Sequence, residues 1–194
     1  MVDFDAPGDK VISPRSLAHV FLRTNNYRAM VDFYKVFLGA ESRYESERVA
    51  FISYDEEHHR IAIAAIPGTG EKLKTSAGLE HIAFTFTSLH ELALAYRQRK
   101  SLGITPVWCV NHGVTTSIYY ADPDGNNLET QFDNFDTIED TNAFMDSKEF
   151  QENPIGTDFD PEDLVRRLQS GEDHASIKKR VEIGRRGVPD HMKA

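Results

Sequence analysis

The pattern of apolar and polar positions predicts the same order of elements twice along the chain. In the first half, short runs rich in β-branched and aromatic residues are typical of strands, and they cover residues 17–22, 41–46, 48–54 and 59–66. Between the first two runs, residues 27–38 carry apolar side chains at helical spacing, and Gly39 follows as a stop signal. The pattern therefore predicts a βαβββ module at residues 16–67.

The order repeats after residues 68–78, which have linker composition. A second module is predicted at residues 79–133, with a helix at 89–102 that Ser88 can cap. Its strands are expected at residues 79–84, 105–111, 115–121 and 127–132. One four-stranded sheet with one helix leaves an apolar face open, so the two modules are expected to pair their sheets. We predict an α+β fold in which two paired βαβββ modules form a half-open barrel.

The two ends of the chain lie outside this repeat. Residues 1–15 hold prolines and a glycine among charges and are expected to be an irregular lead-in. Residues 134–194 are expected to be a tail with two helices, the first starting at Asp160-Pro161 and ending at Gly171, the second starting at Glu172-Asp173. Phenylalanines in the tail are too apolar to stay solvated, so we expect it to pack on the barrel or on a partner subunit.

Composition narrows the class of protein. The chain has 194 residues, 40% hydrophobic and 27% charged, which is ordinary for a globular protein. Its net charge of -9 argues against nucleic acid or an anionic membrane as a partner. Cys109 is the single cysteine, so an intrachain disulfide is excluded, and no apolar run reaches membrane-spanning length. We predict a cytoplasmic protein, and the open sheets and apolar tail favour a homo-oligomer.

A hairpin is predicted in the second module. Thr115–Tyr120 is typical of a strand, Asp122-Pro123-Asp124-Gly125 is typical of a tight turn, and Leu128–Phe132 returns as the paired strand. Such a hairpin holds Tyr119 and Glu129 on rigid elements a few ångströms apart.

Two histidines occupy matching positions of the repeat. His19 and His81 each lie within the first strand of a module, among apolar residues. A lone histidine there is more often a satisfied core residue than a ligand. In modules related by a pseudo-twofold axis, however, equivalent first-strand positions converge, so we expect His19 and His81 to face one another across the cavity. Glu129 from the last strand would complete a set of two imidazoles and one carboxylate.

This set has a chemical meaning. Three protein ligands on one face of an octahedral metal leave three open positions, as in non-haem Fe(II) enzymes that bind a substrate and dioxygen together, and Mn(II) accepts the same set. The counterpart of Glu129 in the first module is expected near residue 67 or slightly earlier. Residues 61–67 are Ile-Ala-Ile-Ala-Ala-Ile-Pro, which offer no fourth ligand. A closed four-ligand site is therefore disfavoured.

Three further histidines are candidates. His58 and His59 begin the last strand of the first module, and because strand neighbours point to opposite faces, only one is expected to reach the cavity. An imidazole near a metal but not bound to it suits acid–base work, although both could be surface residues. His112 precedes Gly113 and could equally be a turn histidine.

The run from His112 through Ile118-Tyr119 and Asp122–Gly125 to Glu129 resembles the signature of the type I extradiol ring-cleavage dioxygenases. These enzymes belong to the vicinal oxygen chelate superfamily, which is built from paired βαβββ modules, and the resemblance covers residues 16–132. It implies Fe(II) on His19, His81 and Glu129, and His59 as the acid–base residue. It also implies that His112 and Tyr119 hydrogen-bond the substrate.

The chain departs from common members of that family in having one pair of modules where they have four modules, so it would be a one-domain form. The interval between His59 and His81 is also longer than the resemblance suggests, because of the segment Gly68–Gly78. The implied function is extradiol cleavage of a small catechol-type diol with dioxygen. Two alternatives stay open: a metal-dependent isomerase, epimerase or thiol transferase of the same superfamily, and a protein that binds an aromatic ligand without turnover.

Overall fold

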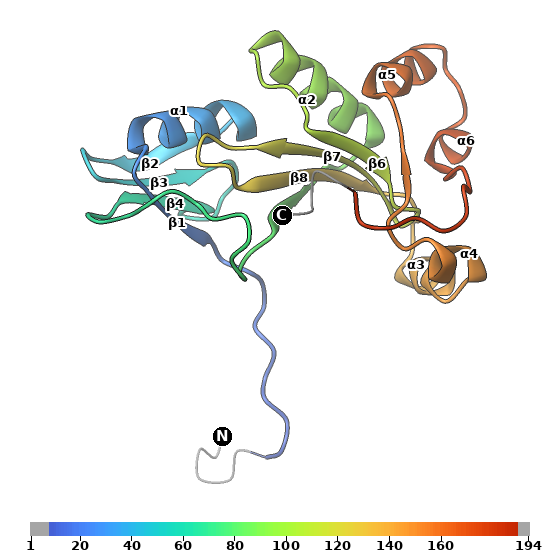
Figure 1. Cartoon of the computed structure of the whole chain (residues 1–194), viewed down its shortest axis with the longest axis horizontal. Coiled ribbons are helices and arrows are strands. Elements are labelled where there is room, and N and C mark those ends of the chain that lie inside the picture. Colours follow the sequence, from blue (N-terminus) through green and yellow to red (C-terminus); the bar gives the residue numbers. More distant parts are fainter. Residues whose placement is uncertain (1–7, 190–194) are drawn as a thin grey trace.

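Two open sheets, each covered on one side by a helix, form the body of the chain (Figure 1). The computed structural model describes residues 8–189. The first module consists of β1 (Val20–Thr24), α1 (Tyr27–Leu38), β2 (Glu41–Glu45), β3 (Val49–Ser53) and β4 (Ile61–Ala65). The second consists of β5 (His81–Thr85), α2 (Leu89–Ser101), β6 (Trp108–Asn111), β7 (Thr115–Ala121) and β8 (Asn127–Asp133). The sheets have the orders β1-β4-β3-β2 and β5-β8-β7-β6-β9, where β9 (Thr157–Asp158) comes from the tail.

Each sheet has a face toward its helix and a face that no helix of its own module covers. In the first sheet, Leu22 pairs with Ile63, and both are buried in the core with α1. The residues beside them, Phe21 and Ala62, also pair with one another and point the other way, because neighbouring strand residues alternate between faces. We call the two faces without a module helix the open faces.

The two helices lie on the same side of the sheets (Figure 1), and their last turns, which carry Phe37 and Arg99, meet in one core. The ring of Phe37 in α1 lies edge-on to Tyr120 of β7, with centroids 5.1 Å apart. Arg99 of α2 is buried over the Phe37 ring and donates two hydrogen bonds to the Phe37 carbonyl, at 2.9 and 2.7 Å. Both open faces are consequently left on the opposite side from this shared core.

The α+β prediction with two βαβββ modules is confirmed, and both sheets are open. The helix predicted at residues 27–38 matches α1, and the side chain of Ser88 caps α2 by accepting a hydrogen bond from the Glu91 amide. The first strand begins later than expected, at Val20, so His19 lies just before it.

The tail contains the two predicted helices, α5 (Pro161–Gln169) and α6 (His174–Lys178), each with an aspartate as N-cap. It also contains α3 (Ile138–Met145), α4 (Lys148–Glu152) and the strand β9. The tail packs on the second module, where α5 contacts α2 and β9 extends the sheet. Of the expected lead-in, residues 1–7 lie outside the described part of the chain, and residues 8–15 form no helix or strand.

Within residues 8–189, no helix combines the length and the apolar character needed to cross a membrane.

Asp122 links the β7–β8 turn to the first module. Its carboxylate accepts hydrogen bonds from the amides of Asp124 and Asn126 within the turn and from the Tyr34 hydroxyl of α1, the last at 3.0 Å. Because Asp122 is buried, Asp122→Ala should leave these donors unsatisfied and lower the free energy of unfolding by about 2–4 kcal/mol. Urea denaturation measures this loss. Tyr34→Phe removes only the bond between the modules and should cost about 1 kcal/mol; equal losses for the two variants would contradict the turn-building role of Asp122.

Candidate functional site

A row of side chains crosses the open face of the second sheet. Ala83 of β5 pairs with Glu129 of β8, Glu129 pairs with Tyr119 of β7, and Tyr119 pairs with Trp108 of β6. Residues paired directly across a sheet share a face, so these side chains lie together on the side away from α2. The predicted closeness of Tyr119 and Glu129 is confirmed by this register.

His81 lies two residues before Ala83, on the same face of β5, and contacts Glu129. Nε2 of His81 lies 3.1 Å from Oε2 of Glu129, and the His81 side chain is 34% exposed whereas that of Glu129 is 7% exposed. The hydrogen bond to Glu129 raises the pKa of His81. Burial pushes the pKa of Glu129 upward, but hydrogen bonds from His81 and Ser117 outweigh it and hold the pKa below its ordinary value. Glu129 is thus an ionised carboxylate beside an accessible imidazole.

His112 and Tyr119 form a second hydrogen-bonded pair beside His81 and Glu129. Nδ1 of His112 lies 2.6 Å from the carbonyl oxygen of Ile155, and Nε2 lies 3.0 Å from the Tyr119 hydroxyl. A carbonyl can only accept, so Nδ1 carries the proton, and a neutral His112 accepts from Tyr119 through Nε2. Burial lowers the pKa of His112, which favours this neutral form, and burial raises the pKa of Tyr119, which keeps its hydroxyl protonated.

The tail and Trp108 complete the surroundings of His112. The Trp108 ring stacks on Tyr119 with centroids 4.9 Å apart, and its Nε1 donates to Asp158 of β9. Arg180 donates to the carbonyl oxygens of His112 and Asn153. The Ile155 carbonyl could not be predicted, because a backbone acceptor is independent of the residue type. The contact of Trp108 follows from its place opposite Tyr119.

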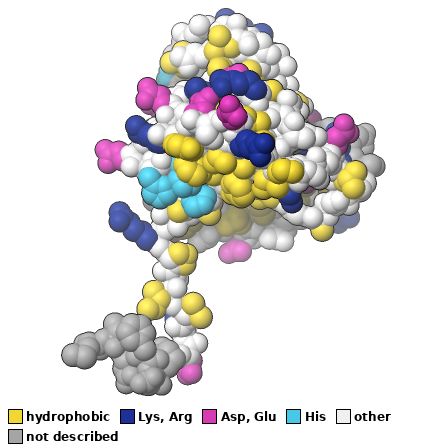
Figure 2. Space-filling view, turned by 90° about the vertical axis from the view of Figure 1, so that its left-hand side faces the viewer, with side chains coloured by type: hydrophobic (Ala, Val, Ile, Leu, Met, Phe, Trp, Pro, Cys, Tyr) yellow, Lys and Arg dark blue, Asp and Glu magenta, His cyan; other side chains and the backbone are white. Residues whose placement is uncertain are grey.

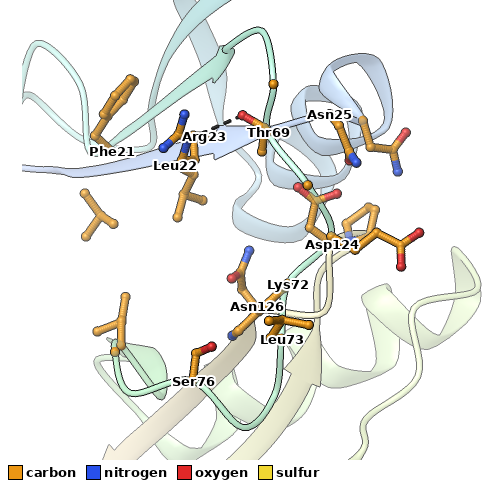
Figure 3. A pocket seen from close by; sticks show the side chains of 18 of the residues that line it. Phe21, Leu22, Arg23, Asn25, Thr69, Lys72, Leu73, Ser76, Asp124 and Asn126 are labelled. Carbon is orange, nitrogen blue, oxygen red and sulfur yellow. Dashed lines mark hydrogen bonds between the residues drawn. The ribbon is translucent and has the colours of Figure 1, made fainter.

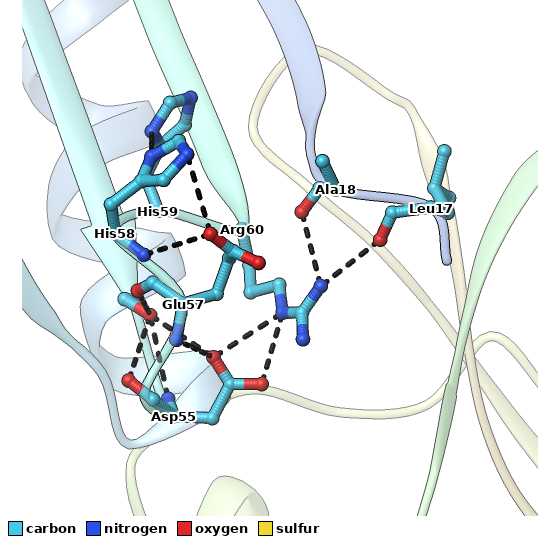
Figure 4. Close-up of polar contacts among 8 residues, drawn as sticks. Leu17, Ala18, Asp55, Glu57, His58, His59 and Arg60 are labelled. Atoms are coloured by element: carbon cyan, nitrogen blue, oxygen red, sulfur yellow. Dashed lines mark hydrogen bonds and ion pairs between the residues drawn. The ribbon is translucent and has the colours of Figure 1, made fainter. Parts of the chain in front are cut away.

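His19 and the His58-His59 pair lie together on the first module. The rings of His19 and His59 have centroids 4.3 Å apart, and His59 stacks on Phe51 of the open face at 4.8 Å. Arg60 fixes this arrangement, since it pairs with Asp55 and donates to the carbonyl oxygens of Leu17 and Ala18 (Figure 4). The chain thus gathers His81, Glu129, His112 and Tyr119 at one place and His19, His58 and His59 at another.

The separations of these side chains can be compared with those in an octahedral metal site. Ligands about 2.1 Å from an octahedral metal lie about 3 Å from their cis neighbours, which is the separation of His81 and Glu129. Within the described residues of one chain, however, no three His, Cys, Asp or Glu side chains are grouped so that they could hold a metal. One chain therefore offers two of the three proposed ligands. The position equivalent to Glu129 in the first module is Ala62, which pairs with Phe21 as Glu129 pairs with Ala83, and alanine cannot ligate.

An open cleft of about 1050 Å³ lies elsewhere, at the junction of the modules (Figure 3). It is lined by β1, by the 68–79 segment and by the β7–β8 turn, with Arg23, Lys72, Asp124 and Asn126 among its polar residues. It holds none of the candidate histidines and neither Tyr119 nor Glu129. We therefore place the candidate site on the open face of the second sheet.

Comparison with known proteins shows the family of the chain. The sequence model of the Glyoxalase/Bleomycin resistance protein/Dioxygenase superfamily matches residues 16–130. The chain is 44% identical over 155 residues to biphenyl-2,3-diol 1,2-dioxygenase 2 of Rhodococcus globerulus. The aligned residues cover 79% of this chain and 82% of the relative. It is 42% identical over 172 residues to biphenyl-2,3-diol 1,2-dioxygenase 3 of the same organism, covering 88% and 90%. The predicted relation to ring-cleaving dioxygenases is confirmed.

Solved structures show the same fold at lower identity. A glyoxalase/dioxygenase from Nostoc punctiforme is 19% identical with a TM-score of 0.53 and covers 65% of this chain and 98% of its own. A glyoxylase/bleomycin resistance protein/dioxygenase domain from Frankia sp. EAN1pec is 17% identical with a TM-score of 0.52, covering 62% and 99%.

Close packing at Gly156 docks the tail beside His112. Gly156 has a φ of +103°, and a Cβ built there would lie 2.3 Å from the Asn111 carbonyl oxygen. Gly156→Ala should therefore move β9 away from β6 and expose Trp108, the single tryptophan, so that its fluorescence emission shifts to longer wavelength. Gly125→Ala is the matched control, because Gly125 also has positive φ but open space around it. Gly125→Ala should lower the free energy of unfolding by about 1–2 kcal/mol without an emission shift. Unchanged emission in Gly156→Ala would contradict the docking described.

Proposed function

The chain belongs to the Glyoxalase/Bleomycin resistance protein/Dioxygenase superfamily, and on this premise we propose that it cleaves the ring of an aromatic vicinal diol by the extradiol route, with dioxygen and a non-haem metal. The observation that carries the proposal is the open face of the second sheet. There a potential ligand pair, His81 and Glu129, lies beside a hydrogen-bonding pair, His112 and Tyr119. The two curated relatives, both named as biphenyl-2,3-diol dioxygenases, support the same chemistry.

The proposed metal ligands are His19, His81 and Glu129. Fe(II), or Mn(II) with the same ligand preference, would supply a position at which a diol and dioxygen are held together. Glu129 suits this role because it is ionised and buried, and His81 suits it because its Nε2 is both accessible and next to the carboxylate. The alanine at position 62 makes a four-ligand site of the isomerase type the weaker alternative.

Tyr119 and His112 would bind and orient the substrate hydroxyls. The Tyr119 hydroxyl is positioned between His112 and Glu129, so it can turn its proton toward either of them or toward a bound diol oxygen. Neutral His112 offers a lone pair at Nε2, because Ile155 holds the proton on Nδ1. Together they would hold a proton at the diol, and the buried surroundings would exclude water from that bond.

The proposed substrate is a catechol with an aryl substituent. Trp108 lies flat on Tyr119 and edge-on to His112, which gives the site an aromatic wall beside its polar centre. Such a wall favours a flat apolar ring attached to the diol. His59 is proposed as the acid–base residue.

The activity test uses biphenyl-2,3-diol. Protein reconstituted anaerobically with Fe(II) should take up one dioxygen per diol and give a yellow ring-opened product. His81→Gln should lose bound iron and lower turnover by at least about 10²-fold, because a side-chain amide is a weaker metal ligand than an imidazole nitrogen. His90→Gln, on the surface of α2, should change neither quantity. Absence of oxygen uptake with every diol of a broad panel would refute the proposal, and activity with Zn(II) alone would favour the isomerase or transferase alternative.

The role of Tyr119 is tested separately. Tyr119→Phe keeps the ring that stacks on Trp108 and removes only the hydroxyl, so iron content should be unchanged while kcat falls roughly 10²-fold. Tyr96→Phe is the control, because the Tyr96 hydroxyl donates a hydrogen bond to Glu162 on the helix side of the sheet, away from the candidate site. Loss of iron in Tyr119→Phe would instead assign Tyr119 to the positioning of Glu129.

A further inference from the structure

We infer that Arg180, near the end of the chain, is a positioning residue for His112. It holds the His112 ring in the tautomer that leaves the lone pair of Nε2 free to accept a hydrogen bond. Arg180 contributes to turnover only if His112 binds the substrate, so the inference rests on the proposed function. The link from Arg180 to the His112 ring exists in metal-free protein and is tested there without turnover.

The guanidinium of Arg180 is buried where three segments of the chain meet. The Arg180 side chain is 1% exposed. It donates to the carbonyl oxygens of His112 at 3.2 Å, Asn153 at 2.7 Å and Glu149 at 3.1 Å. Glu182 accepts from it with both carboxylate oxygens, at 3.0 and 2.8 Å. A guanidinium can serve several fixed acceptors at once, because its five N–H donors lie in a rigid planar fork.

One of these segments carries the carbonyl that sets the His112 tautomer. The fully buried side chain of Asn153 accepts a hydrogen bond from the Gly156 amide and donates one to the Gly156 carbonyl, which closes the turn that contains Ile155. The Ile155 carbonyl oxygen lies 2.6 Å from Nδ1 of His112. Arg180 therefore holds both sides of this hydrogen bond, the backbone of His112 and, through the Asn153 carbonyl, the start of the turn.

The two ends of this turn are held by different contacts. After Gly156, β9 pairs with β6, and Arg186 donates to the Gly156 carbonyl. Before the turn, Arg180 holds the carbonyls of Glu149 in α4 and of Asn153. Loss of Arg180 should therefore release the α4 end of the turn while β9 stays paired. The expected result is a displaced Ile155 carbonyl in a protein that is still folded.

The proton of the His112 ring depends on that carbonyl. A neutral imidazole carries its proton on either nitrogen, and the hydrogen bonds of the ring decide which. With Nδ1 donating to Ile155, Nε2 accepts from the Tyr119 hydroxyl at 3.0 Å. With the carbonyl displaced, the proton can occupy Nε2 as well. Tyr119 then loses its acceptor, and the pair no longer offers a lone pair to a bound diol.

Nitrogen NMR of metal-free wild-type protein tests the first link directly. Long-range ¹H–¹⁵N spectra at about pH 8, where an ordinary imidazole is neutral, distinguish the Nδ1–H tautomer from the Nε2–H tautomer. The His112 signals are assigned by their loss in His112→Gln. They should show the Nδ1–H form. A predominant Nε2–H form in the wild type would overturn the inference without any Arg180 variant.

Two substitutions of Arg180 test the second link. Arg180→Lys keeps the charge, but one compact ammonium group cannot serve the carbonyls of His112, Asn153 and Glu149 together. Arg180→Met removes every donor and keeps most of the length of the side chain. Signals of the Nε2–H form of His112 should appear in both variants and be stronger in Arg180→Met. If Arg180→Met does not fold by circular dichroism, Arg180→Lys decides. Unchanged His112 signals in folded variants would overturn the inference and leave Arg180 with a structural role alone.

Histidines distant from the tail serve as the internal reference. Figure 2 shows histidine side chains at the surface of the side of the molecule that carries the first module, and His58 is 68% exposed. Their signals should be the same in wild type and in both Arg180 variants. A change that spread to these histidines would indicate a general disturbance of the fold and would contradict a positioning role.

Turnover of biphenyl-2,3-diol by iron-loaded protein gives a second readout. Per bound iron, Arg180→Lys should lower kcat by roughly 10-fold and change KM by less than about twofold, because the His112 ring stays in place and only its proton moves. A kcat equal to that of the wild type would contradict the inference. If no form of the protein cleaves a diol while Arg180→Lys still changes the His112 tautomer, the proposed function fails and the positioning of His112 by Arg180 stands.

The matched control is Arg167→Lys. Arg167 is also an arginine of the tail that pairs with both oxygens of a glutamate, Glu172, and donates to a carbonyl, that of Ser176. These partners lie within the tail, so Arg167→Lys should lower the melting temperature and leave the His112 signals and kcat unchanged. A shift of the His112 tautomer in Arg167→Lys equal to that in Arg180→Lys would contradict the specific role of Arg180.

Discussion

The shared core between α1 and α2 is the constraint on which the rest of the structure depends. Phe37, Tyr120 and the buried guanidinium of Arg99 join the helix sides of the two modules. Breaking this contact would expose aromatic rings and leave the buried guanidinium of Arg99 without its acceptor, so the relative placement of the modules is fixed. Both open faces then lie on one side, and every functional side chain discussed lies on or beside one of these faces.

The chemistry of the second sheet follows from the alternation of strand residues. Ile82 and Leu128 point into the core, which forces His81 and Glu129 onto the opposite face. The tail then encloses this face from one end by binding His112 through Ile155. A buried carboxylate, an accessible imidazole and a neutral second imidazole result from packing alone, before any substrate or metal binds.

The sequence was sufficient for the elements and for part of the site. Periodicity and capping residues located α1 and α2, and the turn chemistry of Asp122–Gly125 placed Tyr119 opposite Glu129. The sides on which the modules meet could not be predicted, because Phe21 is as apolar as the core residues next to it and yet lies on the open face. The short helices α3 and α4 and the Ile155 carbonyl depend on tertiary contacts of the tail, which no local pattern records.

The central claim is that one ion is shared by three side chains from the two halves of a duplicated fold. A crystal structure of iron-loaded protein, with the iron located by its anomalous scattering, tests it most directly. We predict an iron within about 2.2 Å of His81 Nε2, a Glu129 oxygen and a His19 nitrogen. Iron bound elsewhere, or bound without His19, would contradict the account.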